Sequence, residues 1–265
     1  MNSTVVFILS ANYSGSTWLA LLMGSHSQAC YAGELNKMFH DDPVPCRLCE
    51  EKGSVCPIFY DVAQTKARHI HDLVLARTGK KVLVDNSKTV SWSRKFLQEN
   101  RFQRKYVHLL RDPRAIAYSL QLRDRSIDIT DWMKKNGDIR DFLQENELDS
   151  RAITYNELAE RTDATLAQLC GWLGLVFEPE QKAYWNFEHH GPGRNGATAA
   201  FLDHYVPSDE QFYSDTKRTQ FHDLRWKEKL DMKTHEAIVC NKELPAFLKE
   251  FELEFSENGL EFSNQ

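Results

Sequence analysis

The sequence lacks the excess of positive charge that nucleic-acid-binding proteins usually carry. Its 265 residues include 33 lysines and arginines against 38 aspartates and glutamates, which gives a formal net charge of -5. Binding to a polynucleotide requires a basic surface that neutralises phosphates, and this composition provides no such overall field. We therefore expect no nucleic-acid partner.

Long apolar runs are also missing. No stretch approaches the roughly 20 apolar residues that a membrane-spanning helix needs, so we expect no membrane span. The apolar run at residues 5–9 has no basic leader and stops at Ser10, which predicts a buried strand and not a secretory signal. Only three of the six cysteines cluster, which argues against a disulfide-stapled secreted scaffold and favours a cytoplasmic protein.

Short apolar runs alternate with helical patterns, which is typical of β-α units around a mostly parallel sheet. We predict one α/β domain over residues 1–265, a three-layer sheet of P-loop type flanked by helices. Its inserted Cys-rich loop spans residues 40–60, and residues 186–265 form a C-terminal loop and helices that close the site. The predicted strands are 4–10, 81–85, 106–111 and 151–155; the predicted helices are 17–25, 113–123, 130–146 and 163–173.

The segment after the first strand has the order of a phosphate cradle: strand, small-residue loop, helix. Ser14, Gly15 and Ser16 let the backbone approach an anion closely. The free N–H groups at the helix start can donate hydrogen bonds to this anion, and so can the hydroxyls of Ser16 and Thr17. No lysine precedes Ser16, so the loop departs from the Walker A pattern of kinases and ATPases. An ordinary strand-to-helix turn with Ser and Thr caps fits the same residues.

A second anion site is predicted where the strand at 106–111 ends. Arg111 lies at the carboxyl end of this strand, the edge at which open α/β sheets bind ligands, and its planar guanidinium can grip a phosphate. Ser119, two helical turns later, can complete the contact, and Asp112 is expected to cap the helix.

These segments resemble the PAPS-dependent sulfotransferases, where PAPS is 3′-phosphoadenosine-5′-phosphosulfate. In that family a Ser-Gly-Ser/Thr-Thr loop holds the 5′-phosphosulfate, and an Arg-Asp-Pro-Arg segment with a later serine holds the 3′-phosphate. The sequence looks most like a bacterial branch, and its counterparts of the branch motifs are Gly33-Glu34-Leu35, Cys46 to Pro57, Asp85-Asn86-Ser87-Lys88, Arg111 to Arg114, Thr154-Tyr155-Asn156-Glu157-Leu158, His189 to Asn195, and Asp223 to Trp226.

The resemblance implies transfer of a sulfuryl group from PAPS to a small-molecule, carbohydrate or peptide acceptor, with 3′-phosphoadenosine-5′-phosphate (PAP) as product. It implies Glu34 as general base and Lys88 as the group that stabilises the leaving phosphate. A solvated loop glutamate and a surface lysine are the alternatives, and Asp85 is either a partner of Lys88 or a strand-end cap. The donor is expected to contact Tyr13, Ser14, Gly15, Ser16, Thr17, Trp18, Arg111, Ser119, Tyr155 and Arg194.

One position departs from the family pattern. The family usually has arginine or lysine immediately before Ser-Gly, and this chain has Tyr13 there. A phenol can donate one hydrogen bond to a sulfonate but cannot neutralise it. Either Lys88, Arg194 or another cation compensates, or the protein binds the nucleotide and transfers poorly. A kinase-like phosphotransferase and a non-catalytic nucleotide-binding protein therefore stay as alternative functions.

The clustered cysteines, Cys46, Cys49 and Cys56, offer three thiolates for a structural zinc ion. His40 could supply the fourth ligand of a tetrahedral site. Free buried cysteines or a local disulfide fit the same spacing, and a zinc-organised interaction module is a further reading of the chain. His189 and His190 are candidates for contacts with acceptor or phosphate, although paired surface histidines commonly do neither.

Overall fold

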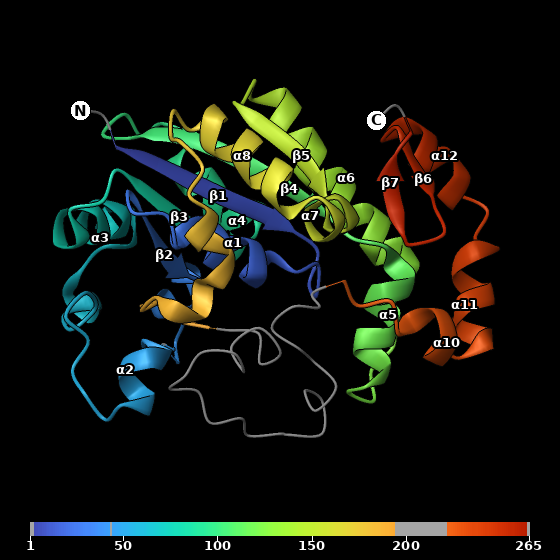
Figure 1. Ribbon diagram of the computed structural model, residues 1–265, viewed down its shortest axis with the longest axis horizontal. Helices are drawn as coiled ribbons and strands as arrows, with labels where there is room; N and C mark the ends of the chain where they lie inside the picture. Colours follow the sequence, from blue (N-terminus) through green and yellow to red (C-terminus); the bar gives the residue numbers. More distant parts are fainter. Residues whose placement is uncertain (1–2, 43, 194–221, 264–265) are drawn as a thin grey trace.

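The computed structural model describes residues 3–42, 44–193 and 222–263. Its centre is a sheet of five strands in the order β2-β3-β1-β4-β5, and every neighbouring pair is parallel (Figure 1). Its strands are β1 (Thr4–Ser10), β2 (Ala29–Gly33), β3 (Val82–Lys88), β4 (Gln103–Leu110) and β5 (Ser150–Thr154).

Helices cover both faces of the sheet because its strands are apolar on both sides. In β1, Val6 and Ile8 pack into the cluster on one face. Phe7 and Leu9, which alternate with them, pack into the cluster on the other face. The first face carries α1 (Ser16–Gly24), α7 (Tyr155–Glu160), α8 (Thr162–Trp172) and the 3-10 helix η5 (Pro179–Asn186). The second carries α3 (Ile70–Thr78), α4 (Val90–Ser93), η4 (Arg94–Phe96) and α6 (Ile129–Glu145).

A third apolar cluster joins the carboxyl end of the sheet to the C-terminal part of the chain. Ala11 follows β1, and Leu110 is the last residue of β4; both pack there with Ile238 and Leu253. The elements around it are α5 (Pro113–Gln121), α10 (Trp226–Lys229), α11 (Met232–Val239), α12 (Leu244–Glu250) and the antiparallel pair β6 (Leu253–Phe255) and β7 (Leu260–Phe262). Among the helices of the described ranges, none is long and apolar enough to cross a membrane.

The three-layer α/β prediction is confirmed, and the four predicted strands and four predicted helices are present with ends shifted by a few residues. Two expectations were incomplete. The strand β2 was not predicted, and Glu34 follows it directly. The Cys-rich loop also contains a short helix, α2 (Arg47–Glu51), while η1 (Leu35–Phe39), η2 (Val62–Gln64) and η3 (Ala67–His69) flank it.

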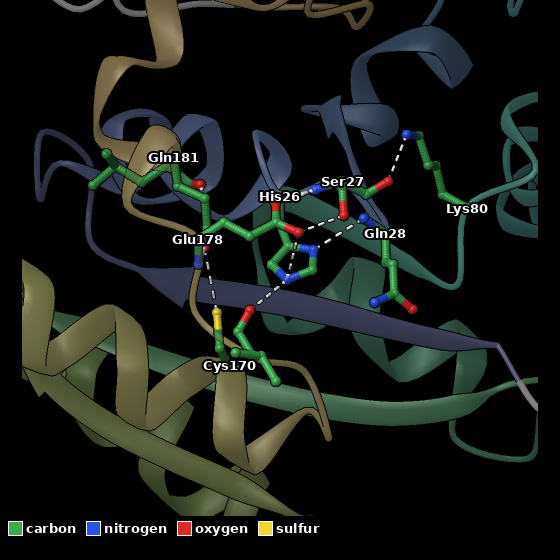
Figure 2. Close-up of polar contacts among 9 residues, drawn as sticks. His26, Ser27, Gln28, Lys80, Cys170, Glu178 and Gln181 are labelled. Carbon is green, nitrogen blue, oxygen red and sulfur yellow. Dashed lines mark hydrogen bonds and ion pairs between the residues drawn. The ribbon is translucent and has the colours of Figure 1, made fainter.

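Polar contacts fasten the turn after α1 to the segment before η5 (Figure 2). The Glu178 carboxylate accepts hydrogen bonds from the Ser27 N–H at 2.7 Å and from the Ser27 hydroxyl at 2.5 Å. Burial raises the pKa of the Glu178 carboxyl, but these hydrogen bonds outweigh it and the pKa lies below its usual value. Beside it, buried His26 accepts from Gln28 through Nδ1 and faces the Val176 carbonyl through Nε2 at 2.9 Å, as a neutral ring protonated on Nε2 does.

Candidate active site

The predicted site residues gather at one edge of the sheet. All five strands are parallel, so their carboxyl ends lie together, at the edge where open α/β sheets bind ligands. Glu34 follows β2, Lys88 ends β3, the loop containing Ser14 follows β1, Arg111 follows β4 and Tyr155 follows β5. The strand order therefore fixes the order of these groups along the edge.

The loop between β1 and α1 has the backbone of an anion cradle. Gly15 is the N-cap of α1 with φ 88°, and Tyr13 also has a left-handed φ of 64°. No side chain caps the helix start, so its first N–H groups point into the loop. A Cβ on Gly15 would lie 2.6 Å from the Tyr155 ring, which adds a packing reason for glycine here. The loop geometry fits a bound phosphate or sulfate group.

Two buried polar atoms beside this loop have no hydrogen-bond partner within the described ranges: the Ser14 hydroxyl and Nε of Arg111. Leaving such atoms unpaired costs roughly 1–3 kcal/mol each, and native structures normally satisfy them. An oxyanion would supply acceptors for both. Thr17 is held from the neighbouring strand, because Nδ2 of buried Asn86 lies 3.5 Å from its hydroxyl. The sequence pattern alone does not indicate this role of Asn86.

Two contacts hold the guanidinium of Arg111. One N–H donates to the Tyr13 carbonyl at 2.8 Å, and the guanidinium lies 4.1 Å from the centre of the Tyr155 ring. Trp18 packs against the same ring, with centroids 5.7 Å apart. Burial raises the pKa of the Tyr155 phenol more than nearby Arg111 lowers it, so this ring is an uncharged platform.

The segment after Arg111 is held by its own contacts. Asp112 caps α5 by accepting from the Arg114 N–H at 2.7 Å, as expected. The Arg114 side chain binds the same carboxylate and stacks on Trp226 at 4.4 Å. Ser119 is half-buried on α5, and its hydroxyl donates to the Ala115 carbonyl at 3.1 Å; in the described part of the chain it makes no hydrogen bond to the loop after β1.

Glu34 and Lys88 form a close ion pair. Oε1 of Glu34, which is 7% exposed, lies 3.0 Å from Nζ of Lys88, and its Oε2 lies 3.0 Å from Nζ of Lys37. Neither is therefore an isolated surface charge, and Lys37 is a member of the group that sequence reasoning missed. Asp85 is not the partner of Lys88. Its carboxylate accepts hydrogen bonds from the Trp92 indole N–H at 2.8 Å and from the Ser87 backbone N–H. These bonds stabilise the buried end of β3.

Tyr13 is surrounded by arginines. Its hydroxyl accepts a hydrogen bond from Arg125 at 3.1 Å, and the Arg123 guanidinium lies 5.3 Å from its ring centre. Both arginines follow α5 and bring positive charge to the place where the family usually has a cation. Arg194, the other proposed source of charge, lies outside the described residues.

The three clustered cysteines meet a histidine, but it is not His40. His40 is exposed, whereas the Cys46, Cys49 and Cys56 sulfurs lie 3.7, 3.5 and 3.5 Å from Nδ1 of His190. All three cysteines are free and buried. The choice of His40 was wrong, because the histidine that lies beside the three cysteines comes from a segment that folds back from beyond α8.

Comparison with known proteins agrees with this architecture. The family model described as "Sulfotransferase family" matches residues 5–179, which is more than half of the chain and reaches all five strands of the parallel sheet. No curated protein matches the chain.

Two solved structures are similar over nearly the whole chain. The sulfotransferase domain from the curacin biosynthetic pathway is 19% identical with a TM-score of 0.58, and the match covers 95% of this chain and 98% of that one. The sulfotransferase domain from the Synechococcus PCC 7002 olefin synthase is 18% identical with a TM-score of 0.55, covering 90% and 94%. These structures share the fold, and the family match together with the sheet edge described above shows that the chain belongs to the sulfotransferase family.

Proposed function

We propose that the protein transfers a sulfuryl group from PAPS to a hydroxyl or similar nucleophile of an acceptor, releasing PAP. The observation that carries the proposal is the order of groups along the sheet edge. The anion loop at Ser14 lies between Arg111 on one side and the Glu34–Lys88 pair on the other. A donor with a phosphosulfate at one end and a second phosphate at the other fits this order.

Donor binding is supported by the unpaired polar atoms of Ser14 and Arg111 and by the α1 N-terminus. In this proposal the loop after β1 receives the 5′-phosphosulfate, and the guanidinium of Arg111 receives the 3′-phosphate. The Tyr155 and Trp18 rings are buried beside the loop and pack against each other, so they support the donor site from behind. A contact of Ser119 with the 3′-phosphate requires its hydroxyl to leave the Ala115 carbonyl.

In the transfer step, Glu34 acts as the base and Lys88 stabilises the leaving group. The acceptor oxygen attacks sulfur in line with the leaving phosphate oxygen, and Glu34 takes the acceptor proton. The new O–S bond forms as the S–O bond to the 5′-phosphate breaks, and the electron pair stays on PAP, where Lys88 stabilises the negative charge. Lys37 holds the second carboxylate oxygen, so Glu34 keeps its orientation when Lys88 turns to the donor.

The arginines around Tyr13 supply positive charge at the position where the family usually has lysine or arginine. With Arg125 donating to the phenol oxygen, the Tyr13 hydroxyl hydrogen is directed away from that arginine and is available to an anion. We assign Arg125, with Arg123, as the cation that compensates for the missing lysine or arginine.

Calorimetric titration with PAP tests the donor site. We expect micromolar affinity, about 8 kcal/mol, that is lost in Arg111→Ala and is much weaker for AMP, which lacks the 3′-phosphate. The matched control is Arg151→Ala, an exposed arginine on β5, which should bind PAP like the wild type. Absence of PAP binding, or preference for ATP with Mg²⁺, would refute the proposal and favour a kinase-like phosphotransferase.

Glu34→Gln tests the transfer step separately. The variant should bind PAP but lose about 10²- to 10⁴-fold in transfer rate, the usual contribution of a general base. Transfer is measured with radiolabelled PAPS against alcohols, phenols, carbohydrates and tyrosine peptides, with Glu145→Gln on the exposed end of α6 as control. Unchanged transfer by Glu34→Gln would remove Glu34 from the mechanism and leave the donor site intact.

A further inference from the structure

We propose that Cys46, Cys49, Cys56 and His190 bind a zinc ion, and that this ion fixes the segment 190–193 against the backbone of Glu34. The four potential ligand atoms all lie within 4.8 Å of one another. Three thiolates and one imidazole form one of the usual ligand sets of structural zinc. The positioning role rests on the function proposed for Glu34, but the metal site itself does not.

The distances within the cluster are those of a metal site. A tetrahedral zinc ion, with bonds of about 2.3 Å to sulfur and 2.0 Å to nitrogen, places each sulfur about 3.5 Å from the nitrogen. The sulfurs of Cys46, Cys49 and Cys56 are 3.7, 3.5 and 3.5 Å from Nδ1 of His190. One ring nitrogen has a single proton or a single lone pair and cannot hydrogen-bond to three sulfurs at once. A cation at the centre of the four atoms accounts for all three distances.

The ligands come from both sides of a contact between distant segments. Cys46 forms a β-bridge with Pro192, and the Arg47 N–H donates to the Gly191 carbonyl at 3.2 Å. His190 precedes this segment directly. Zinc would therefore cross-link the Cys-rich loop to a segment more than 130 residues later in the chain, at the point where their backbones already pair.

The other side of the same segment touches the candidate base. The Glu34 N–H donates to the Pro192 carbonyl at 2.9 Å, and the Tyr31 hydroxyl donates to the Gly193 carbonyl at 3.1 Å. Packing is tight here, because a Cβ on Gly33 would lie 2.4 Å from the Pro192 oxygen. A displacement of residues 191–193 would therefore move the end of β2 and with it Glu34.

Metal analysis of the full-length, tag-free protein, purified without chelators, tests the site. We expect one zinc per chain in the wild type and loss of this zinc in Cys49→Ser and His190→Ala. The matched control is His40→Ala, whose exposed histidine lies outside the cluster and whose zinc content should be that of the wild type. A wild-type chain that neither contains zinc nor takes it up from equimolar zinc would overturn the proposal.

Cobalt substitution of the wild type keeps the test independent of variants that fold poorly. Intense visible bands and thiolate-to-cobalt charge transfer are expected for a tetrahedral site with three sulfurs, and a spectrum of octahedral cobalt without charge transfer would overturn the ligand set.

Hydrogen exchange tests the positioning role. Removing zinc should speed exchange of the Glu34 amide and leave the protection of α1 (Ser16–Gly24) unchanged. Equal exchange at Glu34 with and without zinc would overturn that role. Because zinc content is measured without nucleotide, and PAP affinity without reference to zinc, the metal site and the proposed donor site can fail separately.

Discussion

A buried histidine in β4 makes the stability of the protein depend on pH. His108 is 3% exposed, and its Nε2 lies 3.0 Å from Oδ1 of Asn136. The Asn136 amide nitrogen donates to the Trp132 carbonyl, so the oxygen faces the histidine and Nε2 carries the proton of a neutral ring. Burial lowers the pKa of His108 to about 4, against about 6.5 in an unfolded chain.

The sign follows from proton binding. Between about pH 6.5 and pH 4 the unfolded chain binds a proton that the folded chain refuses, so acidification over this window destabilises the fold. Above this pH window the His108 ring is neutral in both the folded and the unfolded state, and its full contribution to stability is present. From pH 7 to pH 5 the loss due to His108 is about 2 kcal/mol, a substantial part of the roughly 5–15 kcal/mol that a domain has.

Urea unfolding of the wild type and of His108→Gln at several pH values measures this loss. The glutamine amide can donate to Asn136 but does not titrate, so the difference in unfolding free energy between the two proteins should change by about 2 kcal/mol from pH 7 to pH 5. Other titrating groups are common to both proteins and cancel. Parallel pH curves would show that His108 titrates normally and would refute the argument.

Two further substitutions test the loop and the segment after β4. Gly15→Ala should lower stability by about 1–3 kcal/mol and weaken PAP binding, since φ is 88° and the new Cβ meets the Tyr155 ring at 2.6 Å; unchanged calorimetric Tm and affinity would contradict this. Arg114→Lys should cost about 1–2 kcal/mol, because lysine loses the paired bonds to Asp112 and the stacking on Trp226; scanning calorimetry with no fall in Tm would exclude a structural role for this arginine.

The parts of the fold that sequence predicted are those with a strong local pattern. The run at β1 is apolar on both faces and ends at a small-residue loop, so its strand and the following helix were found within one residue. The strand β2 reads Ala-Cys-Tyr-Ala-Gly, with few residues of high strand propensity, and it forms because it pairs with β3 and is buried. Local propensity could not reveal a strand created by its neighbour.

The residues of the candidate site were likewise predicted where the local pattern is strong and missed where only the fold brings them together. The anion loop and Arg111 were predicted because each lies next to a recognisable strand end. The pairing of Lys88 with Glu34 and not with Asp85 depends on the order of β2 and β3 in the sheet, which spacing does not encode. His190 was missed as a partner of the cysteines for the same reason, since only the folded chain brings its segment to them.

The strand order also limits what a ligand at this edge can be. Glu34 and Arg111 follow β2 and β4, which lie three strand steps apart, so the two positions are separated by about 14 Å along the edge. The anion loop lies between them. A ligand that reaches from Lys88 across the loop to Arg111 must be extended and must carry negative charge at both ends, as a nucleotide with 3′- and 5′-phosphates does.

In the proposed reaction the acceptor then has to approach Glu34 from the β2 side, where residues 191–193 lie against the strand. Acceptor choice should therefore respond to changes in this segment, while PAP affinity should respond to changes at Arg111.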